Sequence, residues 1–234
     1  MRALRNATSG APLRLALAGP DEFLPLEPDP TLDWDQHALQ LRALADAYAA
    51  MDYDLVALRP IEAERLGEAG APLSSSFVTA YDTPATRVLL PEAGGVGIVV
   101  FPDIPSDASP PPDMIRSVGD AGRGLRATTR LVIGMSPWGH WQEQEFLDNS
   151  PDVFDILLGS GNGGGLTARA EARDSTVWAR SYTKGKVLQE LDILAWPDHK
   201  GTQRWIMDET IGYGYTSLGE EIKDDKAIKR LFAF

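Results

Sequence analysis

The sequence of 234 residues contains no cysteine and only three histidines, His37, His140 and His199. The absence of cysteine excludes disulfides, thiolate catalysis, zinc ribbons and iron–sulfur clusters. Because the histidines lie far apart in the sequence, a metal site would depend mainly on carboxylate oxygens. The chemistry open to this chain is therefore that of oxygen atoms and isolated imidazoles.

Long hydrophobic runs and an excess of positive charge are also absent. No stretch approaches 18 consecutive apolar residues, so we expect no membrane-spanning segment. The apolar run over 13–18 is short and contains Arg14, a pattern that does not fit a signal peptide. The 22 Lys and Arg face 34 Asp and Glu, a net charge of -12, which repels polyphosphates. We therefore expect no nucleic-acid partner.

The remaining composition is that of a globular protein, with 43% hydrophobic and 24% charged residues. The length fits one large domain, which we place at 13–234 after an N-terminal extension over 1–12. Short apolar runs alternate with helical periodicity, which predicts an α/β fold. We expect strands at 13–18, 55–58, 74–78, 86–90, 96–101, 131–135, 154–158, 176–179, 187–196 and 204–207. We expect helices after a cap at Asp33 or Asp35, at 61–68, 113–125 and 140–148, and a closing helix at about 219–233.

A glycine-rich loop follows the expected strand at 154–158, and its spacing Gly159-x-Gly161-x-x-Gly164 formally matches a dinucleotide fingerprint. That fingerprint requires a helix at its last glycine, whereas residues 166–173 alternate between apolar and polar as in a strand. Two interpretations stay open. One is a flexible loop, and the other is a small-anion or nucleotide phosphate site made of backbone N–H groups at Gly159, Gly161, Asn162 and Gly164.

Other catalytic patterns are weak. Ser136 is followed by Pro137 and lacks the Gly-x-Ser-x-Gly elbow of a hydrolase triad. His140 is interpreted as a partly buried histidine at a helix start. Glu62 and Glu64 are two residues apart and diverge on a helix, which does not suit paired acid and base roles. Five of the six tryptophans lie in the C-terminal half, where core packing is the default and a partner-binding surface the alternative.

Four segments carry a family resemblance when they are taken together. Residues 15–28 read LALAGPDEFLPLEP, residues 52–67 read DYDLVALRPIEAERLG, residues 131–139 read LVIGMSPWG, and residues 154–163 read FDILLGSGNG. In this order and spacing they resemble the calcineurin-like metallophosphoesterases, in particular their 5'-nucleotidase branch. The resemblance covers about residues 13–196 and implies a truncated four-layer α/β/β/α sandwich.

The resemblance also implies positions for the family's metal ligands. Asp21 falls on the first metal-binding aspartate, and Phe23 stands where the metal-binding histidine belongs. Pro60 and Ile61 replace a ligand asparagine and the catalytic histidine.

Three further histidine positions of the family are occupied here by Pro137, Gly161 and Gly163. The resemblance therefore implies a vestigial cleft made of Asp21, Phe23, Pro60, Ile61, Glu62, Pro137, His140, Gly161 and Gly163.

The family's reaction uses two divalent metals about 4 Å apart to generate a hydroxide nucleophile. Only Asp21 remains as a ligand of the expected type, and one carboxylate cannot hold two dications. Hydrolysis of phosphate monoesters needs on the order of 20 kcal/mol of catalysis or more. We therefore expect no resident metal, cofactor or catalytic residue. Because about 38 residues follow Trp196, the resemblance further implies that the family's C-terminal nucleotidase domain is lacking.

The leading functional hypothesis is a non-catalytic 5'-nucleotidase-like pseudoenzyme that acts as a binding or accessory protein toward a protein partner. The alternative is a phosphoester or nucleotide hydrolase with a rebuilt, atypical site that uses Asp21, Glu62, Glu64 and His140. The resemblance favours an extracytoplasmic, periplasmic location.

Overall fold

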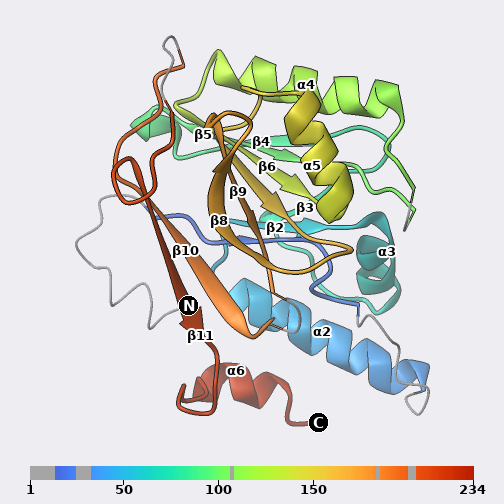
Figure 1. Cartoon of the computed structure of the whole chain (residues 1–234). Coiled ribbons are helices and arrows are strands. Elements are labelled where there is room, and N and C mark those ends of the chain that lie inside the picture. The colour runs from blue at the N-terminus through green and yellow to red at the C-terminus, as the bar shows by residue number, and fades with distance from the viewer. Residues whose placement is uncertain (1–13, 25–32, 106–107, 183–184, 200–203) are drawn as a thin grey trace. The chain divides into compact units, whose positions relative to one another are not determined.

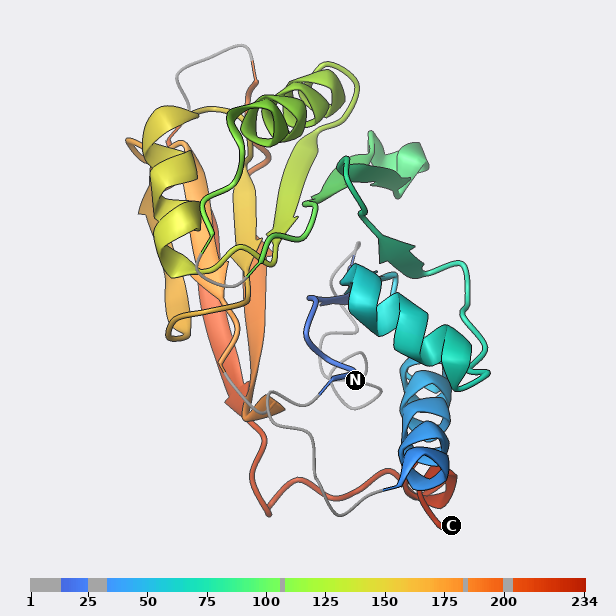
Figure 2. The ribbon, with the colours of Figure 1, turned by 90° about the vertical axis from the view of Figure 1, so that its right-hand side faces the viewer.

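A computed structural model describes residues 14–24, 33–105, 108–182, 185–199 and 204–234 (Figure 1; Figure 2). The predicted N-terminal extension lies outside the described residues. The chain forms two compact units, one up to Val78 together with Lys223–Phe234, and one over Thr79–Ile222. The single domain expected from the sequence stays a prediction, because spatial compactness does not measure independent folding.

The first unit holds a three-stranded sheet in the order β1-β2-β3, of which β1 and β2 are parallel. Its strands are β1 (Leu17–Ala18), β2 (Leu55–Leu58) and β3 (Phe77–Thr79), the last of which ends at the boundary between the units. Its helices are α2 (Trp34–Ala50), α3 (Pro60–Glu68) and α6 (Lys226–Leu231). The short helix α6 contacts α2, although it follows the second unit in the sequence (Figure 1).

Helix α2 begins as the sequence predicts. The side chain of Asp33 accepts a hydrogen bond from the backbone N–H of Gln36 at 2.9 Å, which caps the helix. Its small and apolar face packs onto the sheet because those residues recur every three or four positions. The core of this unit contains Ala18, Phe23, Ala38, Leu41, Ala45, Tyr48, Val56, Leu58, Leu66 and Ala69.

The second unit holds a six-stranded mixed sheet and a two-stranded ribbon. The sheet order is β4-β5-β6-β7-β9-β8, and the central strands β5, β6, β7 and β9 run parallel. The sheet strands are β4 (Ala85–Leu89), β5 (Val96–Val100), β6 (Leu131–Ser136), β7 (Ile156–Gly159), β8 (Leu166–Glu171) and β9 (Thr176–Arg180). The ribbon pairs β10 (Val187–Ile193) with β11 (Ile211–Ser217), and the helices are η1 (Pro91–Ala93), α4 (Pro112–Arg126) and α5 (His140–Asn149).

Strands β5 and β6 are buried along their whole length, as their runs of Val, Ile and Leu predict for central parallel strands. Side chains from α4 and α5 share one core with strand residues, so both helices cover the same face of the sheet (Figure 1; Figure 2). That core contains Val99, Phe101, Ile104, Val118, Val132, Trp138, Phe146, Leu147, Val153, Phe154, Leu157 and Trp178.

Two expected strands are shorter or displaced. The strand expected at 13–18 is reduced to Leu17–Ala18 within the described residues, and the one expected at 74–78 is Phe77–Thr79. The strands expected at 86–90 and 96–101 are confirmed as β4 and β5, which pair antiparallel. Strand β8 follows the glycine loop, which confirms that no helix opens there.

The C-terminal elements differ more from the sequence-based prediction. The strand predicted at 204–207 is wrong, because only Met207 takes part in an isolated bridge, to Ile211. The strand that forms is β11, whose Gly-Tyr-Gly-Tyr sequence gives little strand signal but pairs over seven residues with β10. The closing helix predicted at about 219–233 covers only Lys226–Leu231, because Asp225 caps it by accepting from the N–H of Ala227 at 2.7 Å.

The predicted fold class is confirmed as a mixed α/β fold with parallel and mixed sheets. Among the described residues, no helix combines the length and apolarity needed to cross a bilayer.

Candidate functional site

The surviving carboxylate Asp21 already has a cation beside it. It follows β1 in a turn where its own φ is 74°, a left-handed conformation that aspartate tolerates better than most residues. Arg59 leaves the end of β2, and its Nη1 lies 3.0 Å from Oδ1 of Asp21. Both side chains are about one quarter exposed. The carboxylate that the resemblance assigns to a metal is therefore neutralised by a guanidinium of the same unit.

Glu62, on the first turn of α3, is buried and uses both oxygens on the backbone. Its Oε2 accepts from the N–H of Arg59 at 2.8 Å and from the N–H of Asp21 at 3.2 Å, and its Oε1 accepts from the N–H of Phe23 at 2.9 Å. Burial raises the pKa of Glu62, and these three N–H groups act in the opposite direction. The carboxyl ties the turn after β1 to the start of α3, which is a structural role.

The other predicted positions in this unit are apolar, with Phe23 buried and Pro60 and Ile61 half-buried. Phe23 is 2% exposed, and its ring lies 4.9 Å from that of Tyr48 and 5.7 Å from that of Phe77. Pro60 is the first residue of α3, a position that proline favours. Ile61 is the next residue of α3, and no side chain among Phe23, Pro60 and Ile61 offers a lone pair to a metal.

In the second unit, Arg180 at the end of β9 organises the glycine loop. Its Nη2 donates to the carbonyl oxygens of Ser160 at 2.7 Å, Asn162 at 3.0 Å and Gly161 at 3.2 Å. Its Nε donates to the carbonyl oxygen of Gly164 at 3.2 Å. The predicted anion loop thus turns four carbonyls toward an internal cation, whereas an anion would need converging N–H groups.

The charge of Arg180 is balanced by Glu143 from α5. The two form a salt bridge in which the side chains are 1% and 0% exposed, and the indole N–H of Trp178 donates to Glu143 Oε2 at 2.9 Å. Burial raises the pKa of Glu143 to about 7, against the lowering effects of Arg180 and Trp178. This pair was not predicted from the sequence, although a charged residue inside a buried strand and another on a packed helix face are the signal for one.

Three glycines of this loop, Gly159, Gly161 and Gly163, leave no room for side chains. A Cβ on Gly161, whose φ is 71°, would lie 2.2 Å from the carbonyl oxygen of Pro137. A Cβ on Gly163, whose φ is 111°, would lie 2.7 Å from the Cβ of His140. A Cβ on Gly159 would lie 2.0 Å from an oxygen of Glu143. Histidines at 161 and 163 would therefore require a different loop conformation.

His140 is the first residue of α5, as predicted, and its backbone N–H donates to the carbonyl oxygen of Asn162 at 2.8 Å. Its ring lies 4.9 Å from the ring of Trp178 and 5.4 Å from that of Trp141. Desolvation lowers the pKa of His140, and the positive charges of Arg180 and Arg169 lower it further. The structure confirms a partly buried histidine at a helix start.

The structure thus brings the predicted residues together in two sets, Asp21, Phe23, Pro60, Ile61 and Glu62 in one unit and Pro137, His140, Gly161 and Gly163 in the other. Across the described part of the chain, no three His, Asp or Glu side chains converge as a metal cluster would require. The oxygens that could bind a metal in the first unit already have other partners: the carboxylate of Asp21 pairs with Arg59, and that of Glu62 accepts from backbone N–H groups. These residues do not fit a two-metal centre.

Sheet order and register define the class of fold, a mixed α/β fold with parallel and antiparallel strand pairs. No family model matches the sequence, and no curated protein matches it. The chain is similar in structure to the sulfate thiohydrolase SoxB of Thermus thermophilus, solved in complex with glycerol, with a TM-score of 0.66 and 15% identity. The match covers 99% of this chain and 43% of that one, so the chain spans less than half of the SoxB chain. At this identity the likeness shows the fold alone.

A second solved structure, a hypothetical protein that also comes from Thermus thermophilus, matches at 15% identity over 61% of this chain and 69% of that one. Its TM-score of 0.33 is too low to support a comparison of folds.

Proposed function

We propose that this chain is a non-catalytic, 5'-nucleotidase-like pseudoenzyme that serves as a binding or accessory protein. The observation that carries the proposal is the pair of Arg59 and Asp21 at 3.0 Å. A guanidinium supplies the positive charge that a metal would otherwise supply to the carboxylate, but it has no vacant coordination position and cannot activate water.

The remaining contacts support the same conclusion. Three of the roughly four lone-pair positions of the Glu62 carboxylate are already taken by backbone N–H groups, which leaves little capacity for a metal. At Gly161 and Gly163 the packing of the loop excludes ligand side chains. A rebuilt hydrolase site would need several of these contacts to break at once, each with its own cost in stability.

Exposed aromatic groups support a binding role. The side chain of Trp141, beside the glycine loop, is 79% exposed. Three other tryptophans of this unit are buried in the core and are not open to a partner: Trp138, Trp178 and Trp205. Large exposed aromatic side chains are enriched at protein interfaces.

The test combines metal binding with turnover. The purified protein is equilibrated with Mn²⁺ and analysed for bound metal, and it is then assayed with p-nitrophenyl phosphate, with adenosine monophosphate and with thiosulfate. The last substrate is included because the SoxB neighbour is a sulfate thiohydrolase. We expect substoichiometric metal and the same background rate for the wild type and Asp21→Ala.

Two metals per chain together with turnover that Asp21→Ala abolishes would establish the hydrolase alternative instead. Calorimetric titration with inorganic phosphate and with adenosine monophosphate addresses the anion-loop prediction separately. Heat from phosphate alone would assign the loop a binding role without chemistry.

A further inference from the structure

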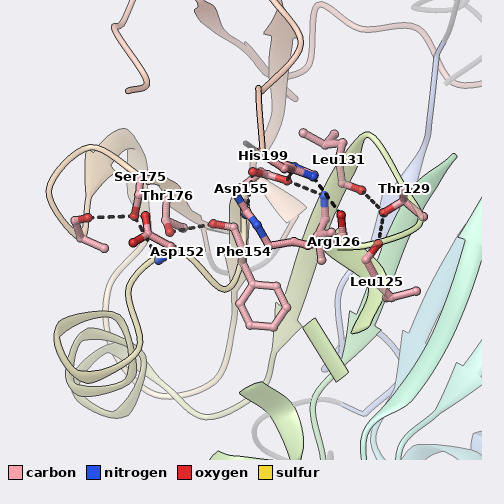
Figure 3. A network of polar contacts seen from close by, with 12 residues as sticks. Leu125, Arg126, Thr129, Leu131, Asp152, Phe154, Asp155, Ser175, Thr176 and His199 are labelled. Carbon is pink, nitrogen blue, oxygen red and sulfur yellow. Dashed lines mark hydrogen bonds and ion pairs between the residues drawn. The ribbon is translucent and has the colours of Figure 1, made fainter. Parts of the chain in front are cut away.

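A polar network lies outside the candidate site, before the start of β7. Asp155 is 1% exposed, and its Oδ1 accepts from Nη1 of Arg126 at 2.8 Å. Its Oδ2 accepts from the backbone N–H of Val132 at 2.7 Å and lies 3.0 Å from Nε2 of His199 (Figure 3). The carboxylate therefore joins the end of α4, the sheet, and the chain that follows β10.

His199 makes contacts through both ring nitrogens. Nε2 faces the Asp155 carboxylate, and Nδ1 lies 3.2 Å from the carbonyl oxygen of Arg126 (Figure 3). A carbonyl oxygen only accepts, and so does a carboxylate that already receives a guanidinium and an amide. Both ring nitrogens must therefore donate, which only the doubly protonated imidazolium can do.

This arrangement differs from a catalytic His–Asp pair. In a catalytic pair one ring nitrogen is bound to the carboxylate and the other is available to take a proton from a nucleophile. Here the second nitrogen is bound to the carbonyl oxygen of Arg126, and the ring is 15% exposed. The pair can hold a segment of chain in place, but it has no nitrogen left for proton transfer.

We propose that His199 is a proton-operated latch that holds residues 194–199, the segment after β10, against this edge of the second unit. The segment has two other kinds of anchor. The backbone N–H groups of Leu194 and Ala195 donate to the carbonyl oxygen of Thr210 at 3.0 and 3.1 Å, and the guanidinium of Arg130 lies 4.3 Å from the ring centroid of Trp196.

The sign of the pH response follows from the contacts. When the ring loses its second proton, one nitrogen presents a lone pair to an acceptor, so an attraction becomes a repulsion. The charged groups at the ring are Asp155 and its ion-pair partner Arg126. Asp198 precedes His199 in the sequence, and Arg130 lies over the ring of Trp196 in the same segment. A ring with one nitrogen deprotonated can donate in only one of its two contacts, so we expect the latch to be closed at low pH and to loosen as pH rises.

The experiment is amide hydrogen exchange of the full chain by NMR between pH 5.5 and 8, corrected for intrinsic exchange. We expect the Leu194 and Ala195 amides to open about tenfold more at pH 8 than at pH 5.5, the effect of losing one charge-assisted hydrogen bond. The midpoint of this change should coincide with ring protonation of His199, followed by its carbon-bound protons, and differ from those of His37 and His140.

Variants provide the control. His199→Gln should show the faster exchange at both pH values, whereas His37→Gln, which removes an imidazole from α2 in the other unit, should keep the wild-type response. Equal protection of the two amides at pH 5.5 and 8 in the wild type would overturn the proposal. So would a response that persists unchanged in His199→Gln or that follows the titration of another histidine.

Discussion

The buried pair of Arg180 and Glu143 predicts a large loss of stability when one partner is removed. Arg180→Met keeps much of the aliphatic volume but leaves the Glu143 carboxylate in the core with only neutral donors, the indole N–H of Trp178 and the side chain of Ser136. Removing one member of a buried ion pair costs about 3–5 kcal/mol, because the other charge is left uncompensated. The loss of the hydrogen bonds from Arg180 to the carbonyls of the glycine loop adds less to this cost, because water can bind carbonyl oxygens in a surface loop.

The assay is urea unfolding of the wild type and Arg180→Met, followed by circular dichroism and tryptophan fluorescence. Arg123→Met is the matched control, because Arg123 pairs with Asp120 at 2.7 Å on the surface, where such a pair contributes about 0–1 kcal/mol. A cost for Arg180→Met no larger than that of Arg123→Met would refute the reasoning.

A double variant separates the burial of charge from the loss of packing. In Glu143→Leu combined with Arg180→Met, no unpaired charge is left, so we expect it to be at least about 2 kcal/mol more stable than Arg180→Met alone. An additive result, in which the second substitution only adds cost, would show that the two side chains are not energetically coupled.

The pH dependence has a defined direction. Burial raises the pKa of Glu143 to about 7, above its usual 4.5, so the folded state retains a proton that the unfolded chain releases. The stability from this group is fully present below about pH 4.5 and is lost as pH rises through about 7. Arg180 lowers this pKa, so Arg180→Met should raise it further, and its cost should be greater at pH 8.5 than at pH 6. A cost that does not change with pH would contradict this assignment.

Three further substitutions test local features, each by urea unfolding. Gly161→Ala should cost at least about 2 kcal/mol, because the φ of Gly161 is positive and the added Cβ would meet the carbonyl oxygen of Pro137. In the control Gly164→Ala the added Cβ meets nothing within 4 Å, so this variant should cost less than about 0.5 kcal/mol. Similar costs for the two variants would contradict the loop packing. Glu62→Gln should cost about 2 kcal/mol, since an amide cannot accept at both atoms from three N–H groups, and a neutral result would remove its structural role. Asp33→Ala should cost about 1 kcal/mol through the lost cap of α2, and unchanged stability would show that the cap is dispensable.

Much of the fold could be predicted from the sequence. Apolar runs located the central strands β5, β6 and β7, and the 3.6-residue period located α2. These signals are local, because a strand buried on both faces and a helix with one apolar face each need a particular spacing of side chains. Strand β11 could not be predicted, because its glycines give no propensity and its seven paired residues depend on β10.

Residue identities alone are enough to say which ligand-type side chains this chain can offer. Asp21 is a carboxylate, whereas no metal-binding group is carried by Phe23, Pro60, Pro137, Gly161 or Gly163. Residue identity is sufficient for that conclusion, since a side chain without a lone pair cannot coordinate in any fold. How the charged groups pair, in contrast, follows from the three-dimensional fold. Arg59 meets Asp21 across 38 positions, Arg180 meets Glu143 across 37, and His199 meets Asp155 across 44. Such pairings depend on which segments the sheets bring side by side, and that placement is decided by burial of the whole core, which no local pattern encodes.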